Sequence, residues 1–286
     1  MAAINTVGLI SKPAVPAAAE VVPKLLAWLE SRGIHVRYDE HAAFYAARTG
    51  GLMRQEVPEG CDLVIVLGGD GTLLSAARAI GNRQIPLFAV NLGSLGFLTA
   101  ITIDDLYPEL ERALRGEHRI GRRKLLHAEV HRGGAVVSHY EALNDVVLTK
   151  AAIARIIDLD TYVDRQFVCA YKADGLIVST PTGSTAYSLS AGGPIIFPSV
   201  PAICLTPICP HMLTYRPVLV SESSEVEVRC RGDASVYLTI DGQIGEPLER
   251  EDSVVCRSSQ YALHLIRPPR MMFFDVLRQK LKWGER

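Results

Sequence analysis

Three glycines and one aspartate stand directly after a short aliphatic run, at a place where a chain can bind phosphate. Residues 63–67 read Leu-Val-Ile-Val-Leu, and residues 68–72 read Gly-Gly-Asp-Gly-Thr. Because glycine has no side chain, backbone N–H groups in such a loop can approach an anion closely. For this pentapeptide alone, a tight strand-to-helix turn with Asp70 as a helix cap is the alternative. Phosphate binding is predicted for Gly68, Gly69, Gly71 and Thr72.

A second glycine-containing segment follows the next aliphatic run. Residues 87–90 are Leu-Phe-Ala-Val, and residues 91–98 are Asn-Leu-Gly-Ser-Leu-Gly-Phe-Leu. In open α/β sheets, loops at the carboxyl ends of neighbouring strands line the ligand crevice. Neither loop has the Rossmann pattern G-x-G-x-x-G or the P-loop pattern G-x-x-x-x-G-K-[ST]. The sequence therefore excludes a standard dehydrogenase and a P-loop enzyme.

The densest group of polar side chains follows a third aliphatic run, at residues 176–178. Residues 180–194 read Thr-Pro-Thr-Gly-Ser-Thr-Ala-Tyr-Ser-Leu-Ser-Ala-Gly-Gly-Pro. Hydroxyls and glycines can bind the oxygens of ribose and phosphate, and a tyrosine face can pack against a base or ring. A polar hairpin loop is the alternative, because Ser, Thr, Gly and Pro also form turns.

The elements that position these segments differ between the two halves of the chain. Up to about residue 119, aliphatic runs alternate with stretches of helical spacing, as in a parallel sheet covered on both faces. Pro23, inside the first helical stretch, predicts a kink or a late helix start. After residue 119, short β-branched runs separated by Gly, Asp, Pro and Ser indicate antiparallel β-structure, and Phe274, Leu277 and Leu281 indicate a closing helix. The charged residues 115–124 are the expected linker, with the boundary near Gly121.

The composition of the chain limits the classes of protein to which it can belong. A chain of 286 residues, 48% of them hydrophobic, can form two unequal domains. The net charge of −1 gives no electrostatic footprint of nucleic-acid binding. The N-terminus lacks a charged signal region and no apolar run approaches the ~20 residues that span a bilayer, so no membrane association and a cytoplasmic location are expected.

Cysteines and histidines do not form a recognisable metal site. Six scattered cysteines without a Cys-x-x-Cys pair read as reduced, mostly buried thiols. Cys204, Cys209 and His211 lie close together, but their spacing fits no zinc pattern. His127 and His131 stand four apart in a stretch that looks like a strand, where such residues are far apart. No metal-ligand residues are therefore predicted.

Taken together, these segments resemble the NAD kinases. The resemblance is carried by residues 68–72, 91–98, the pair Asn144-Asp145 and residues 174–194, and it covers nearly the whole chain. The Gly-Gly-Asp-Gly-Thr element is shared with diacylglycerol-type lipid kinases and, in related form, with phosphofructokinases. The Thr-Gly-Ser-Thr-Ala-Tyr run at residues 182–187 narrows the resemblance to NAD kinases.

The resemblance implies a fold and an activity. The expected fold is a Rossmann-like α/β domain (residues 1–120), an antiparallel β-sandwich domain (121–267) and a C-terminal helix (268–286) that returns to the first domain. The expected reaction transfers the γ-phosphoryl group of ATP to the 2′-hydroxyl of the adenosine ribose of NAD, forming NADP, with Mg²⁺ or another divalent cation. A homo-oligomer, dimer or tetramer, is expected from the family.

The resemblance also assigns roles to single residues. Asp70 matches the catalytic aspartate beside the acceptor hydroxyl, and Asn144 and Asp145 match the pair that recognises ribose. Alone, Asn144-Asp145 and Asp241-Gly242 are also typical of turns. A basic Lys172 is expected to favour NAD over NADH and ATP over polyphosphate. The other expected substrate contacts are Gly71, Asp174, Thr185, Ala186, Tyr187, Ser190 and Asp241.

Two alternatives stay open at this point. A lipid or sugar kinase of the same superfamily would share the Gly-Gly-Asp-Gly-Thr loop but would leave residues 182–190 without a role. A non-catalytic NAD-sensing protein would be expected to have lost the aspartate of that loop, which is present here as Asp70.

Overall fold

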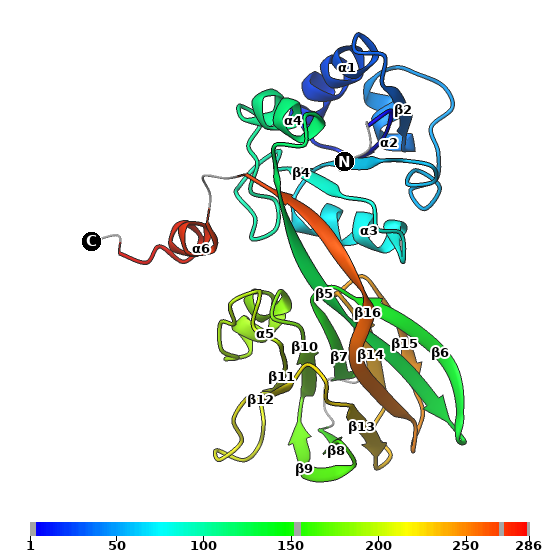
Figure 1. Ribbon diagram of the computed structural model, residues 1–286. Helices are drawn as coiled ribbons and strands as arrows, with labels where there is room; N and C mark the ends of the chain where they lie inside the picture. Colours follow the sequence, from blue (N-terminus) through cyan, green and yellow to red (C-terminus); the bar gives the residue numbers. More distant parts are fainter. Residues whose placement is uncertain (1–3, 152–155, 269–271, 285–286) are drawn as a thin grey trace. The chain divides into compact units, whose positions relative to one another are not determined.

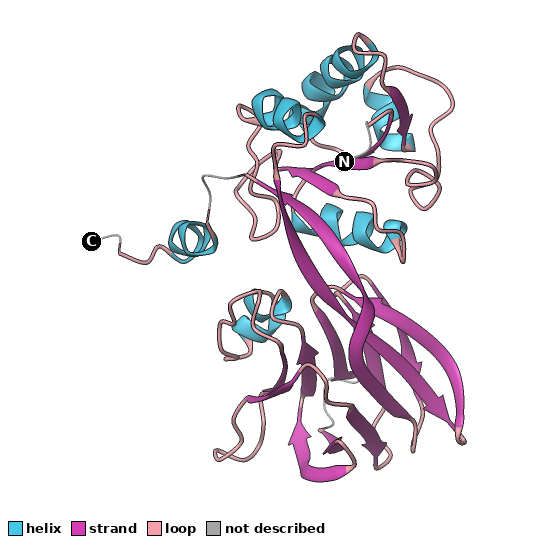
Figure 2. Cartoon of the chain, in the orientation of Figure 1, coloured by secondary structure: helices cyan, strands magenta, loops and turns pink. Residues whose placement is uncertain are grey.

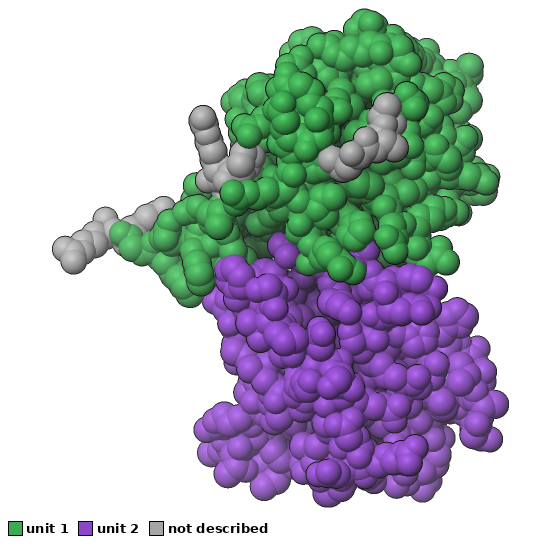
Figure 3. Space-filling model, viewed as in Figure 1, with its two compact units in different colours: residues 1–122, 263–286 green, residues 123–262 purple. Residues whose placement is uncertain are grey.

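The computed structural model describes residues 4–151, 156–268 and 272–284, which form two compact units. Unit 1 comprises Met1–Arg122 and Leu263–Arg286, and unit 2 comprises Arg123–Ala262 (Figure 3). The chain passes from one unit to the other inside two long strands, β5 (Arg119–Arg132) and β16 (Ser253–Arg267). Unit 1 is therefore built from two separate stretches of sequence.

The centre of unit 1 is a parallel sheet (Figure 1). Its strands lie in the order β2 (His35–Tyr38), β1 (Thr6–Ser11), β3 (Leu63–Leu67), β4 (Leu87–Val90), and all three adjacent pairs are parallel. The end of β16 joins β4 in parallel through Leu265 and Leu87. The continuous aliphatic runs of β3 and β4 are buried on both faces, which explains their lack of alternation.

Five helices belong to unit 1 in the described part of the chain. The first, α1, continues through Pro23, so the expected late helix start is wrong; Val22, Leu25 and Leu26 on its inner face are fully buried, and this packing outweighs the lost backbone donor. The helices are α1 (Pro16–Glu30), α2 (Glu40–Tyr45), α3 (Asp70–Ile80), α4 (Leu106–Leu114) and α6 (Phe273–Leu281).

Unit 2 consists mainly of antiparallel strands in two sheets (Figure 2). In the first, β16, β13, β8 and β9 follow one another, and β5 pairs with β16 and β6. The second has the order β12-β11-β10-β7-β14-β15. The bounds of the first set are β6 (Ala135–Ala142), β8 (Ile157–Val163), β9 (Gln166–Ala173) and β13 (Val226–Arg231). Those of the second are β7 (Asp145–Lys150), β10 (Gly175–Ser179), β11 (Ala202–Ile208), β12 (Val218–Ser221), β14 (Val236–Ile240) and β15 (Ile244–Leu248).

The hydrophobic core of unit 2 lies between the two sheets. Leu148 and Val178 of the six-stranded sheet belong to the same buried cluster as Leu159 and Val228 of the other sheet. The opposite face of the six-stranded sheet carries a small cluster of Val147, Ile177 and Ile208, against which Ala191 packs. The hydroxyl-rich segment, with the 3-10 turn η1 (Gly183–Thr185) and the short helix α5 (Tyr187–Ser190), precedes Ala191 directly. The expected fold class, α/β followed by an antiparallel β-sandwich with a returning C-terminal segment, is confirmed.

The division between the units falls after Arg122, inside the charged stretch of residues 115–124, but the stretch is a strand from Arg119 onward rather than a loop. Strand β5 begins at Arg119, and within it Arg122 and Lys124 are exposed while Arg123 and Leu125 between and after them are buried. Alternation of exposed and buried side chains is the pattern of a strand with one solvated face. Arg122 and Lys124 therefore belong to the exposed side of a strand, whereas Arg123 lies on its buried side.

Candidate functional site

Asp70 is the first residue of α3, and it does not cap that helix. The N-cap position belongs to Gly69, whose extended backbone (φ −97°, ψ −170°) leads from β3 into the helix. The interpretation of Asp70 as a helix cap is therefore wrong. The first N–H groups of a helix have no partner inside it and carry a partial positive charge, so the start of this 11-residue helix favours an anion.

The carboxylate of Asp70 holds the second glycine loop in place. Its Oδ2 accepts a hydrogen bond from Phe97 N (2.9 Å), and its Oδ1 accepts from Leu98 N (3.1 Å), Thr99 N (3.1 Å) and Thr99 Oγ1 (3.0 Å). A Cβ atom at residue 96 would overlap Asp70 Oδ1, which is why a glycine stands there. We call this arrangement, Asp70 with residues 97–99, the Asp70 clamp.

The two oxygens of Asp70 are unequally engaged. Among the described residues, Oδ1 accepts from three donor atoms and Oδ2 from one. A carboxylate oxygen has two lone pairs, so Oδ2 is the atom that can accept a further hydrogen bond. The clamp thus fixes the orientation of the carboxylate and leaves one oxygen able to contact a hydroxyl.

Unit 2 contains a second carboxylate that binds three successive backbone amides. Asp241 Oδ2 accepts from Leu143 N (3.0 Å), and Asp241 Oδ1 accepts from Asn144 N (2.7 Å) and Asp145 N (3.1 Å). Asp241 (φ 51°) and Gly242 (φ 63°) form a type I′ turn between β14 and β15, closed by Gln243 N and Ile240 O at 3.0 Å. Asp241 is therefore a turn residue and, at the same time, the acceptor for three backbone amides of the predicted site. We call Asp241 with residues 143–145 the Asp241 clamp.

Asp145 is a buried carboxyl group beside another acid. Its side chain is 4% exposed, and Asn144 before it is 9% exposed. Burial, with a smaller contribution from the negative charge of Asp241, raises the pKa of Asp145 to about 7. The Asp241 clamp thus has an acid whose charge changes near neutral pH.

The hydroxyl-rich segment packs directly against the Asp241 clamp. Thr180 donates its hydroxyl to Leu143 O (2.6 Å) and its N–H to Asn144 O (2.9 Å), and its hydroxyl accepts from Gly183 N (3.0 Å). A Cβ atom at residue 183 would overlap Asn144 O. The segment is thus a 3-10 turn and a short helix rather than the alternative hairpin loop.

The predicted contact residues of this segment differ in exposure. Thr185 and Ala186 are half-buried, Ser190 is exposed, and Tyr187 is 44% exposed with its ring accessible for packing. Ser188, which faces inward, is bound to Thr206 on β11 through their hydroxyls at 2.9 Å. That bond anchors α5 to the sheet and leaves Tyr187 and Ser190 on the outside.

Asp174, directly before β10, lies at the other end of the six-stranded sheet, and Lys172 is on β9 of the other sheet. Asp174 accepts a hydrogen bond from Lys150 Nζ at 2.6 Å, and Lys150 stands at the end of β7 opposite to Asp145. At 3.3 Å per residue the two ends of β7 are about 17 Å apart. Lys172 is 68% exposed and lies 3.9 Å from Asp158. The structure therefore brings Asn144, Asp145, Asp241 and residues 180–186 together, and it places Lys172 and Asp174 apart from them.

Sequence reasoning missed the residues that organise the site. Thr99 completes the Asp70 clamp, Thr180 joins two segments of unit 2, and Lys150 pairs with Asp174. Each partner is 24 to 37 residues away along the chain, so no local pattern shows the contact. The sequence likewise does not show that one carboxylate accepts hydrogen bonds from several consecutive backbone amides, as in the two clamps.

A metal-ligand cluster and a membrane-spanning helix are both absent from the residues that the structure describes. Within residues 4–151, 156–268 and 272–284, no group of three or more His, Cys, Asp or Glu side chains is arranged to hold a metal ion. Cys204 is buried, whereas Cys209 and His211 are exposed. None of the helices in the described residues is long and apolar enough to cross a membrane.

The chain is similar to known proteins in both sequence and fold. Residues 7–118 match the ATP-NAD kinase N-terminal domain, and residues 143–268 match the ATP-NAD kinase C-terminal domain. A protein of Solibacter usitatus named NAD kinase is 72% identical over 100% of both chains. NAD kinases of Koribacter versatilis and Geobacter sulfurreducens are each 49% identical, over 99% of this chain and all of theirs.

Solved structures extend the comparison. The yeast NADH kinase complexed with NADH is 27% identical, covers 100% of this chain and 90% of its own, and superposes with a TM-score of 0.91. An NAD kinase from Archaeoglobus fulgidus in complex with ATP covers 95% of this chain and 98% of its own with a TM-score of 0.76. At 24% identity the latter likeness concerns the fold alone.

Proposed function

The chain belongs to the ATP-NAD kinase family, and from this premise we propose that it transfers the γ-phosphoryl group of ATP to the 2′-hydroxyl of the adenosine ribose of NAD, forming NADP. The observation that carries the proposal is the Asp70 clamp, which orients one carboxylate at the start of α3 and leaves its Oδ2 able to contact a hydroxyl. The three bacterial relatives described above are all named NAD kinase, which does not favour the lipid-kinase, sugar-kinase and sensor alternatives.

Asp70 is the proposed catalytic residue, and its first role is to orient the acceptor hydroxyl. An alkoxide is a far stronger base than a carboxylate, so early removal of the hydroxyl proton by an aspartate would be steeply unfavourable. Phosphoryl transfer passes through a loose transition state in which positioning and charge neutralisation dominate. Asp70 therefore holds the hydroxyl in line first and accepts its proton late.

Backbone amides of the first glycine loop are the proposed phosphate contacts. The N–H groups at the start of α3 supply positive partial charge without a charged side chain. Gly69 and Gly71 are the proposed contacts. The backbone amides of Gly68 and Thr72, which were also expected to bind phosphate, already donate to Val90 O (2.9 Å) and Gly69 O (3.0 Å).

The acceptor NAD is proposed to bind through unit 2. The Asp241 clamp and Thr180 fix the segment that contains Asn144 and Asp145, and this supports ribose recognition by that pair. Tyr187 presents an exposed ring for packing against a base or nicotinamide. The remaining proposed contacts are Gly71, Lys172, Asp174, Thr185, Ala186, Ser190 and Asp241.

The divalent cation is proposed to arrive with the donor, as Mg·ATP. Mg²⁺ is commonly held by substrate phosphates with one or two carboxylates rather than by a dedicated protein cage. Asp70 fits this mode, because its Oδ2 accepts one hydrogen bond and can contact an ion as a single carboxylate oxygen. When bound, the ion would neutralise charge on the phosphates.

A cytoplasmic location and a homo-oligomeric assembly are also proposed. Six free cysteines, four of them buried, suit a reducing cytoplasm. The sequence resemblance supports a homo-oligomer, dimer or tetramer. The net charge of −1 supports small-molecule rather than nucleic-acid partners.

The direct test is NADP formation by the purified protein. The protein is incubated with NAD, ATP and Mg²⁺, and product is measured with an NADP-specific dehydrogenase, with reactions lacking ATP as the control. We expect NADP to accumulate in proportion to enzyme. Binding of NAD without turnover would favour the sensor alternative. Phosphorylation of a lipid or sugar instead of NAD would show that the protein is a lipid or sugar kinase of the same superfamily.

A further inference from the structure

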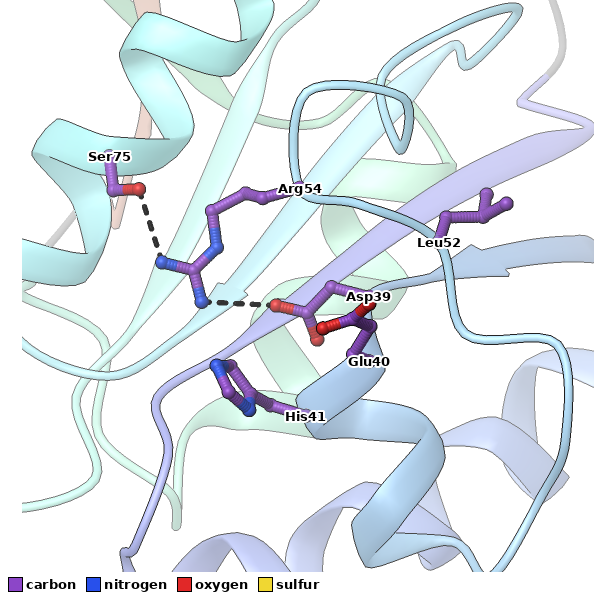
Figure 4. Close-up of a pocket in the computed structure, with 6 residues that line it drawn as sticks. All are labelled: Asp39, Glu40, His41, Leu52, Arg54 and Ser75. Atoms are coloured by element: carbon purple, nitrogen blue, oxygen red, sulfur yellow. Dashed lines mark hydrogen bonds and ion pairs between the residues drawn. The ribbon is translucent and has the colours of Figure 1, made fainter.

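Unit 1 contains a cavity of about 260 Å³ that none of the predicted site residues lines. Figure 4 shows its wall, with the guanidinium of Arg54 pointing between Ser75 and Asp39 and the ring of His41 beside them. The six lining residues are Asp39, Glu40, His41, Leu52, Arg54 and Ser75.

The cavity lies at the carboxyl edge of the parallel sheet. Asp39 follows β2 directly, and Arg54 donates from Nη2 to the carbonyl of Ser11, the last residue of β1 (3.0 Å). The neighbouring strand β3 ends at the first glycine loop, and Lys12 N bonds to Leu67 O (2.8 Å) across that edge. Cavity and loop therefore share the edge at which open α/β sheets bind ligands.

Helix α3 connects the cavity to the glycine loop. Ser75 is on this helix, one turn (about 5.4 Å) beyond Gly71. Its Oγ accepts from Arg54 Nη1 at 3.1 Å, so the cavity wall braces the helix whose N-terminus is the proposed phosphate site. A ligand with phosphates at the loop can extend along this edge into the cavity.

The charge of the lining excludes a phosphate as its occupant. Arg54 Nη2 lies 3.1 Å from Oδ2 of Asp39, which is 2% exposed, so the positive charge is neutralised by a buried partner. Glu40 adds a carboxylate, and Asp39, Glu40 and Arg54 together carry one negative charge. Such a lining repels polyphosphate, whereas it suits a neutral group with N–H and O–H donors.

We propose that this cavity takes the nucleoside end of the phosphoryl donor, its purine base and ribose, while the phosphates lie at the glycine loop. The proposal rests on the proposed function and adds where the donor base binds. Glu40 is the acceptor for amino or hydroxyl donors, and His41 and Leu52 supply surfaces for a flat ring. The volume is just below the ~300 Å³ at which pockets for drug-sized ligands begin, which fits a nucleoside.

The main test fills the cavity and separates base from phosphate recognition. Leu52→Trp should raise the KM for ATP at least tenfold and weaken inhibition by ADP competitive with ATP by the same factor. The KM for NAD and inhibition by tripolyphosphate, which has no base, should stay unchanged. Met53→Trp, at the adjacent position whose side chain is 52% exposed, is the matched control and should behave like the wild type.

A second variant covers the case in which Leu52→Trp does not fold. Glu40→Gln, on an exposed residue, should raise the KM for ATP several-fold with no effect on tripolyphosphate inhibition. Unchanged ATP and ADP parameters in the folded variants, or equal losses for ADP and tripolyphosphate, would overturn the proposal. Calorimetric titration of ADP into wild type and Leu52→Trp decides the same question without turnover, so absence of NADP formation would contradict the proposed function alone.

Discussion

The same device occurs once in each unit, with different consequences. In unit 1 the carboxylate of Asp70 accepts from the backbone amides of residues 97–99, and in unit 2 that of Asp241 accepts from those of residues 143–145. In both, an acid from one segment fixes three consecutive amides of a distant one. The chemical surroundings differ, because the Asp70 clamp adds the hydroxyl of Thr99, whereas the Asp241 clamp contains a second acid, Asp145.

This difference separates two uses of a carboxylate. One hydroxyl and three amides donate hydrogen bonds to the Asp70 carboxylate and set its direction. Asp241 is also supplied with amides, but it lies beside Asp145, whose pKa is raised mainly by burial and to a smaller extent by the charge of Asp241. The first clamp thus orients a carboxylate, and the second lies beside a buried acid whose charge depends on pH.

The largest effect is expected from breaking the chemistry of the first clamp. Asp70→Asn should lower kcat by roughly 10²- to 10⁴-fold, the usual range for loss of a general base, while the KM for NAD changes only a few-fold. The NADP-coupled assay measures both parameters. Near-normal turnover would remove Asp70 from the catalytic role.

Thr99→Val is the matched control for that variant. It deletes the hydroxyl donor to Asp70 Oδ1 and keeps the Thr99 amide, so the carboxylate stays in place. We expect stability to fall by about 1 kcal/mol and kcat to fall only a few-fold. If Thr99→Val lost as much activity as Asp70→Asn, the orientation of the Asp70 carboxylate rather than its charge would explain the loss of activity in Asp70→Asn.

Breaking the second clamp should weaken acceptor binding more than chemistry. Asp241→Ala leaves the amides of Leu143, Asn144 and Asp145 without their acceptor and should lower the free energy of unfolding by about 2 kcal/mol or more. We expect the KM for NAD to rise about tenfold, with a smaller change in kcat. Urea unfolding and steady-state kinetics test this, and an unchanged KM for NAD would separate Asp241 from the acceptor site.

A third experiment uses pH to sharpen the contrast between the clamps. The pKa of Asp145 is about 7 in the folded protein and about 3.9 in an unfolded chain. Protonated Asp145 therefore contributes stability that is fully present below about pH 4 and is lost as the pH rises through 7. Asp145→Asn removes the titrating group, so its stability relative to wild type should increase with pH by roughly 1.4 kcal/mol per unit in that range.

Urea unfolding of both proteins at pH 5, 6, 7 and 8 measures this difference. Groups other than Asp145 titrate in both proteins and cancel from the comparison. A difference that is constant across pH would show that Asp145 is ionised throughout.

The smallest effect is expected at Lys172, which lies outside both clamps. Its side chain is 68% exposed and its 3.9 Å approach to Asp158 contributes little stability. Lys172→Gly should change the preference for NAD over NADH, or for ATP over polyphosphate, by a few-fold. Identical ratios of kcat/KM for the four substrates in variant and wild type would contradict the role assigned from the resemblance.

The strands next to the glycine loops could be predicted from sequence, because the signal is local. The aliphatic runs at residues 63–67 and 87–90 coincide with β3 and β4. The division between the units falls within residues 115–124, but charge density alone could not distinguish a loop from the exposed side of β5, because both are in contact with solvent. A late helix start at Pro23 does not occur, because burial of the helix face is a tertiary effect that the sequence pattern does not show.

The site itself was predictable only as a set of segments. Asp70 stands out in a glycine loop, but its bonds to residues 97–99 depend on β3 and β4 being neighbours in the sheet. Asp241 looks like an ordinary turn residue, and it is one; its second role requires β14 to lie beside β7. The cavity at Arg54 left no sequence signal, since its wall combines residues from positions 39 to 75 without a motif.

The interrupted chain path of unit 1 has a consequence for biosynthesis. Strand β4 acquires its neighbour through Leu265 only after all of unit 2 has been translated. At about 5–20 residues per second, the ribosome takes on the order of ten seconds to make that stretch. During this time the part of β4 around Leu87 lacks its second neighbour, although Ile101 already bridges Val90 at the other end of the strand. Unpaired strand edges promote aggregation. Messages truncated before β16 should therefore yield products that depend on chaperones and are readily degraded.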